Sequence, residues 1–191
     1  MANAGVRFKI ESYLDGLVGA LRGLDRDAIE AFVEALRRAR REGRQVFLFG
    51  NGGSAANASH LAVDLAKGLS YGREKRFKVF CLNDNVPTML AYANDLGFAD
   101  IFVEQLKNHL RPGDVVIAIS GSGSSENVIR AVDYANQSGA VTVGLCGFSG
   151  GELKRKATIA VHTGIDDMQK SEDLSLIVGH IVYQVLDGED A

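Results

Sequence analysis

Residues 45–69 read QVFLFGNGGSAANASHLAVDLAKGL, and this stretch decides the fold. Its first part, Val46–Phe49, is an unbroken apolar run, which is typical of a strand buried on both faces. Glycines that allow a sharp turn and a close approach to a ligand follow this run: Gly50, Gly52 and Gly53. Ser54 is then placed to cap a helix. A strand, a glycine loop and a helix N-terminus predict a binding site for a phosphate-bearing ligand.

The composition predicts a single soluble domain that works in the cytoplasm. The chain has 191 residues, 46% of them hydrophobic, and a net charge of −3, which gives no basis for non-specific binding of nucleic acid. Glu11 and Asp15 argue against a signal peptide, and no apolar run approaches the roughly 18 residues of a membrane span. Cys81 and Cys146 lie in strand-like runs and are expected to be buried, reduced thiols.

The rest of the chain alternates predicted strands with predicted helices. We expect a helical pair in residues 1–43 and an α/β core in residues 44–191, together one domain. The predicted strands after the first are 77–82, 115–119, 141–146 and 158–162. The predicted helices are 8–24, 26–42, 87–93, 98–110, 126–137 and 171–186. This alternation favours a doubly wound, parallel, five-stranded sheet of the flavodoxin-like kind, with two extra N-terminal helices.

A second loop rich in glycine and serine, Ser120–Ser125, follows the strand predicted at 115–119. Loops at the carboxyl ends of parallel strands converge on one crevice, so the two loops are expected to share a ligand. No Walker lysine follows either loop, and no acidic residue stands at the spacing of a dinucleotide site. Neutral N–H and hydroxyl donors suit a phosphate monoester. The alternative is that each loop is only a turn.

The motifs together resemble a sugar-isomerase (SIS) domain. They are Gly50-Asn-Gly-Gly-Ser-Ala, His60, Asn94-Asp95-Leu-Gly-Phe98, Ile119-Ser-Gly-Ser-Gly-Ser-Ser125 and His180. Within SIS proteins the sequence resembles the phosphoheptose isomerases, over nearly the whole chain. The resemblance implies conversion of sedoheptulose 7-phosphate to a glycero-manno-heptose 7-phosphate, a homotetramer with sites at subunit interfaces, and zinc in some members.

The resemblance also assigns residues to the site. Catalytic roles fall to Asp64 and His180. The positions expected to contact substrate are Asn51, Gly52, Gly53, Ser54, Asp64, Asn94, Asp95, Ser120, Gly121, Ser122, Ser125 and Glu172. The sequence departs from the family at several of these positions: Asp64 replaces a catalytic Glu, Glu172 a Gln, and Gly121 a frequent Thr. Ser175 also replaces a frequent His.

His60 and Asp64 are four residues apart and share one helix face. A carboxylate and an imidazole are sufficient for aldose–ketose isomerisation through an enediol. The same side chains, with His180 and Glu172, are acceptable ligands for zinc or another divalent cation. Eight helical residues span about 12 Å, so Glu172 and His180 can share one ion only if Glu172 precedes the regular helix or comes from another subunit.

Two classes of function therefore remain open. The first is an isomerase that needs no nucleotide cofactor. The second is a non-catalytic SIS protein that binds a sugar phosphate or a protein partner, as do relatives that associate with the replication initiator DnaA. The substitutions at positions 64 and 172 keep the second class open, and the length and stereochemistry of the sugar are not encoded in any motif.

Overall fold

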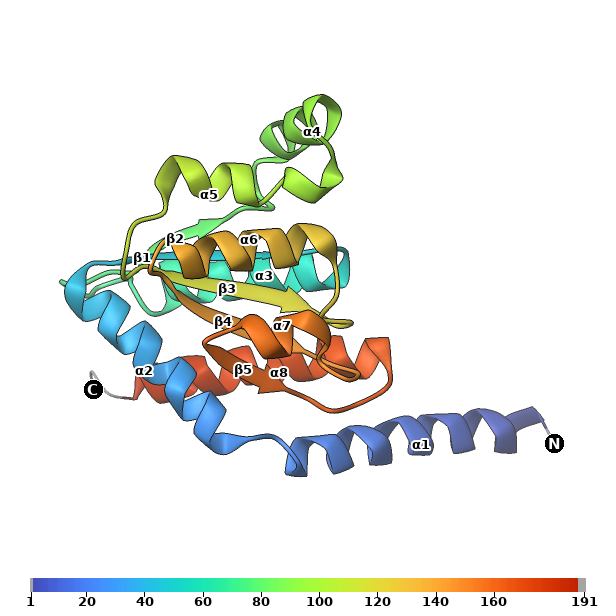
Figure 1. Cartoon of the computed structure of the whole chain (residues 1–191). Helices are drawn as coiled ribbons and strands as arrows, with labels where there is room; N and C mark the ends of the chain where they lie inside the picture. The colour runs from blue at the N-terminus through green and yellow to red at the C-terminus, as the bar shows by residue number, and fades with distance from the viewer. Residues whose placement is uncertain (1, 189–191) are drawn as a thin grey trace.

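The computed structural model describes residues 2–188 and shows a parallel sheet between two layers of helices (Figure 1). The strand order is β2-β1-β3-β4-β5, and every neighbouring pair is parallel. The strands are β1 (Gln45–Gly50), β2 (Lys78–Cys81), β3 (Val115–Ser120), β4 (Val141–Cys146) and β5 (Ile159–His162). This is the flavodoxin-like order. The predicted doubly wound, five-stranded parallel sheet is confirmed.

The helices cover both faces of the sheet. They are α1 (Ala2–Arg22), α2 (Arg26–Glu42), α3 (Gly53–Val63), α4 (Val86–Asp95), α5 (Val103–His109), α6 (Glu126–Gln137), α7 (Gly151–Lys156) and α8 (Met168–Asp187). A π-helical turn, η1 (Asp64–Gly68), extends α3, and a 3₁₀ turn, η2 (Phe98–Asp100), precedes α5. None of the described helices is long and apolar enough to cross a membrane.

Side chains of β1 alternate between two hydrophobic cores. Val46 and Leu48 pack with residues of α2, α3 and α8, whereas Phe47 and Phe49 pack with residues of α5 and α6 on the other face. Because both faces of a central parallel strand are covered, the run has to be apolar throughout rather than alternating.

Two helical predictions need correction. The helix expected at 98–110 is η2 followed by α5, because Ile101 and Phe102 turn into the core between them. On α8, the helical spacing of the apolar residues predicts that Ile181 and Val185 are buried, but they are 38% and 43% exposed. The Asp25 side chain caps the N-terminus of α2, because it accepts a hydrogen bond from the Ala28 N–H at 3.1 Å.

The helix α1 lies apart from the sheet, alongside α8 (Figure 1). The Tyr13 hydroxyl donates to Asp173 Oδ2 at 2.5 Å, and Lys170 Nζ lies 4.4 Å from the Tyr13 ring centre. The hydrogen bond to Asp173 is the main reason why the pKa of Tyr13 rises to about 12. Large apolar side chains along α1 remain exposed: Val6, Phe8, Ile10, Leu14 and Val18. This apolar stripe is not covered by the rest of the described chain.

Candidate active site

A hollow of about 270 Å³ lies between the two glycine-rich loops. These loops leave the carboxyl ends of β1 and β3, which are neighbours in the sheet. The lining residues are Asn51, Gly52, Gly53, Ser54, Ser120, Gly121, Ser122, Ser125, Met168 and Glu172. In an open α/β sheet this edge is where ligands bind. The structure thus brings both predicted loops and Glu172 to one site.

The first loop turns through glycine into α3. Gly52 has φ 55° and ψ −123°, a conformation that side chains strongly disfavour, and α3 begins at the next residue. Ser54 therefore lies within the first helical turn, and the prediction that it caps the helix is wrong. Because Gly53 and Ser54 line the hollow, the positive end of the α3 dipole faces any ligand bound there.

The second loop presents hydroxyl groups to the same hollow. The Gly123 N–H donates to the Ser120 carbonyl oxygen at 3.0 Å and to its Oγ at 3.2 Å, which folds the loop tightly. The Ser122 Oγ accepts from the Ser124 N–H at 3.3 Å. Ser125 is the N-terminal cap position of α6, but its side chain makes no capping bond and lines the hollow instead. The loop can thus donate from both hydroxyl and N–H groups.

The N-terminal part of α8 closes the remaining side of the hollow. A Cβ atom at position 53 would collide with the Glu172 carboxylate, and one at position 121 would lie 2.6 Å from Met168 Sδ. Glycine at these loop positions therefore makes room for the α8 side chains. Met168 was not among the predicted site residues. It fills the space next to Gly121.

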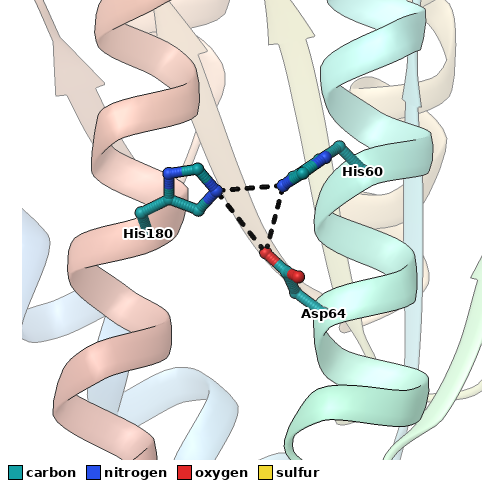
Figure 2. Close-up of side chains that lie close together, drawn as sticks. All are labelled: His60, Asp64 and His180. Carbon is teal, nitrogen blue, oxygen red and sulfur yellow. Dashed lines mark hydrogen bonds and ion pairs between the residues drawn. The ribbon is translucent and has the colours of Figure 1, made fainter.

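A second group of side chains lies farther along α3, where this helix packs against α8 (Figure 2). His60 Nε2 is 2.9 Å from His180 Nε2 and 3.5 Å from Asp64 Oδ2, and His180 Nε2 is 3.9 Å from the same oxygen. Figure 2 shows the two imidazole rings and the carboxylate pointing toward one another. The residues predicted to act together, His60, Asp64 and His180, are brought together by the fold.

The spacing of these three ligand atoms fits a metal ion. Ligands that bind zinc tetrahedrally at about 2.1 Å lie roughly 3.4 Å apart, and the three observed separations bracket that value. Two imidazole nitrogens and a carboxylate oxygen are also a ligand set that zinc accepts. The π-helical turn η1 starts at Asp64, and such turns are frequent at functional sites. Nothing in the sequence pattern indicated this turn.

Comparison with known proteins gives the family. The model of the SIS domain family matches residues 12–147. The phosphoheptose isomerase of Chlorobaculum tepidum is 35% identical over 167 residues, which are 85% of this chain and 79% of that protein. The chain belongs to the phosphoheptose isomerase family of SIS-domain proteins. The phosphoheptose isomerase of Rhodospirillum rubrum is 36% identical over 79% of each chain. A phosphoheptose isomerase structure from Neisseria gonorrhoeae has a TM-score of 0.88 at 23% identity, covering 98% of this chain and all of that one, and shares the fold.

Within the single chain, Glu172 does not join the histidine cluster, and Asn94 and Asp95 do not join the loop hollow. Glu172 belongs to the regular part of α8, and it lines the loop hollow rather than joining the histidine cluster. The prediction of Glu172 as a fourth metal ligand beside His180 is therefore not met within one chain. Asn94 and Asp95 are exposed at the end of α4, where the Asn94 amide donates to Asp95 Oδ1 at 2.8 Å, and they do not line the hollow.

The two cysteines are free thiols; Cys146 is buried as expected, but Cys81 is only partly buried, and its Sγ lies 3.4 Å from Ser59 Oγ. Burial raises the pKa of Cys146 to about 11 and is also the main cause of a raised pKa at the half-buried Cys81. A thiol with a raised pKa is a poor nucleophile. Neither cysteine lines the loop hollow or belongs to the histidine cluster.

Proposed function

We propose that this SIS-domain protein is an aldose–ketose isomerase that converts sedoheptulose 7-phosphate to D-glycero-D-manno-heptose 7-phosphate. Membership of the phosphoheptose isomerase family supports the reaction class. The observation that carries the proposal is a site with two separate ends. One end is a loop hollow that offers neutral donors and is closed by Glu172 of α8. The other end is a carboxylate–imidazole cluster where α3 and η1 face α8.

The phosphate group binds in the hollow between the loops. Its oxygens accept hydrogen bonds from the hydroxyls of Ser54, Ser120, Ser122 and Ser125 and from N–H groups at the start of α3. The absence of a lysine from the lining suits a monophosphate, which neutral donors and a helix dipole can hold. Glu172 then accepts hydrogen bonds from sugar hydroxyls beyond the phosphate.

The distance between the loop hollow and the histidine cluster matches the length of a seven-carbon sugar phosphate. From Ser54 to His60 the α3 helix rises about 9 Å. An extended seven-carbon sugar phosphate has a comparable length, so its phosphate can occupy the hollow while its carbonyl end reaches the histidine cluster. A shorter phosphosugar would leave one end of the site unfilled.

Chemistry takes place at the cluster of His60, Asp64 and His180. The Asp64 carboxylate removes the proton from the carbon next to the carbonyl group, which leaves an enediol. His180 moves protons between the two oxygens, and Asp64 returns its proton to the neighbouring carbon, so that the ketose becomes an aldose with no net change in atoms. Asp is one methylene shorter than the usual Glu, and the helix packing has to bring the sugar correspondingly closer.

As an alternative to acid–base catalysis by the same atoms, the cluster residues also suit zinc. His60, Asp64 and His180 would hold it, and a bound zinc ion would polarise the carbonyl oxygen of the sugar. Further donors would come from the substrate or from another subunit.

A homotetramer with sites at subunit interfaces would complete the arrangement. The exposed apolar stripe of α1 and the lack of buried residues on α4 both favour burial against other copies. Asn94 and Asp95 would then contact the substrate bound to a neighbouring subunit. A cytoplasmic location suits a phosphorylated sugar substrate and two free thiols.

Solvent exchange tests the proposed reaction. Sedoheptulose 7-phosphate incubated with the protein in deuterated water should gain deuterium at C1 or C2, because the proton held by the base exchanges before it returns to carbon. Mass spectrometry and NMR would locate the label. Tight binding of the sugar phosphate without any exchange would reject the isomerase and favour the non-catalytic SIS protein.

A further inference from the structure

The two phosphate loops are joined to each other by a pair of side-chain amides. Asn51 Nδ2 donates to Asn127 Oδ1 at 2.9 Å, and Asn127 Nδ2 donates to Asn51 Oδ1, also at 2.9 Å. Asn51 belongs to the first loop, whereas Asn127 lies in the first turn of α6, directly after the second loop. Asn127 is only 2% exposed and Asn51 is partly exposed, so the pair is shielded from competing water on its Asn127 side.

A second amide holds the first loop from its other side. The Gly50 N–H donates to Asn83 Oδ1 at 3.1 Å, and Asn83 Nδ2 donates to the Gly50 carbonyl at 2.9 Å. Asn83 follows β2, and β1 lies between β2 and β3 in the sheet. The loop after β1 is therefore fixed by one amide from the segment after each neighbouring strand. Position 50 itself has no room for a side chain, since a Cβ there would lie 2.7 Å from the Ile119 carbonyl oxygen.

We propose that Asn127 is a positioning residue that sets the separation of the two phosphate-binding loops through its pair with Asn51. This inference rests on the proposed phosphate site. Asn127 does not line the hollow, so it acts through Asn51 rather than on the ligand. Asn51 commits one N–H and one lone pair to Asn127, which fixes its side chain and leaves its second N–H for the ligand. Phosphate donors have to be held within a fraction of an ångström, so an unfixed loop should bind more weakly.

Hydrogen exchange of the backbone around residues 50–55, measured by mass spectrometry without any ligand, tests the positioning role directly. In Asn127→Ala this segment should exchange roughly tenfold faster than in the parent. Asn127→Asp keeps the shape but replaces the donor to Asn51 with a negatively charged acceptor, so it should show the same direction of change. Gln137→Ala removes an exposed amide from the far end of the same helix and should leave the exchange unchanged.

Binding measurements then separate positioning from a general structural effect. Calorimetry with inorganic phosphate should show affinity lowered roughly tenfold in Asn127→Ala. In an Asn51→Ala background the same substitution should add less than about twofold, because the residue acts through Asn51. With the sugar phosphate, KM should rise while kcat and its pH profile stay near those of the parent, since the histidine cluster is untouched.

The outcomes distinguish this proposal from the isomerase function. Unchanged loop exchange in both Asn127 variants, or fully additive effects of the two alanine substitutions on phosphate affinity, would overturn the positioning role whatever the activity of the protein. Faster loop exchange together with weaker phosphate binding would support it, even if the parent failed to label the sugar. Failure of the parent protein to label the sugar would count against the isomerase reaction and not against the positioning role of Asn127.

Discussion

The loop hollow and the histidine cluster are built in opposite ways. In the hollow, Ser54 and Ser120 are each 5% exposed, and a reciprocal pair of side-chain amides, Asn51 with the buried Asn127, fixes the loops that carry them. In the cluster, the side chains of His60 and His180 are 47% and 51% exposed, and the contacts that join them are to each other and to Asp64. The proposed binding end is thus organised within one chain, whereas the proposed reacting end is about half exposed to solvent. Substitutions in the two regions should therefore affect different observables.

The largest expected effect follows replacement of the carbon base. Asp64→Asn keeps the size and helix position of the side chain but removes the group that accepts the proton. Deuterium exchange into the sugar phosphate should fall by about 10²–10⁴-fold, while binding of inorganic phosphate should change by less than about twofold.

The chain offers a matched control for this substitution. Asp133 lies in the same Ala-Val-Asp sequence on α6, but its carboxylate pairs with Lys156 Nζ at 2.6 Å, away from the cluster. Asp133→Asn should leave exchange unchanged. If Asp64→Asn exchanged at the parent rate and Glu172→Gln did not, the base would be Glu172 in the loop hollow, and the division between the two regions would fail.

A smaller effect is expected on metal binding, and it again tests the difference between the loop hollow and the histidine cluster. Zinc added to metal-free protein should bind at the cluster, and His180→Ala should weaken that binding by at least roughly tenfold, because it removes one of three ligands. Glu172→Gln should retain the parent affinity, because Glu172 lines the hollow and is not part of the cluster. Calorimetry and elemental analysis would measure both variants. Loss of zinc in Glu172→Gln would show that a second subunit brings this carboxylate to the ion.

More of the loop hollow than of the histidine cluster could be predicted from the sequence. The loop residues could be predicted because each loop is continuous in sequence and directly follows a buried strand. The spacing of His60 and Asp64 predicts that they share one helix face. His180 lies 120 residues from His60, and only the family resemblance predicts that the two histidines lie in the same site. Helix periodicity alone cannot show which face of α8 meets α3.

The residues that support the hollow were not predictable in the same way. Asn83 and Asn127 reach the first loop only because β2 and β3 flank β1, and the sequence does not reveal strand order. Met168 fills space that exists only because position 121 is glycine, so its role depends on the packing of α8 against the second loop. Asn94 and Asp95 matched the family motif, yet one chain alone does not bring them to the hollow.

The smallest expected effects lie within the hollow, where many donors share one phosphate group. Ser122→Ala and Ser125→Ala should each weaken binding of the sugar phosphate about fivefold, equivalent to about 1 kcal/mol for one hydrogen bond. Ser125 should have the larger effect of the two, because its side chain makes no capping bond, whereas the Ser122 Oγ already accepts from the Ser124 N–H. Ser149→Ala is the matched control, since this exposed serine lies in the loop after β4 and does not line the hollow. Calorimetry would rank the three variants. Parent-like affinity in both Ser122→Ala and Ser125→Ala would mean that the second loop only supports the first and that the backbone N–H groups at the start of α3 hold the phosphate.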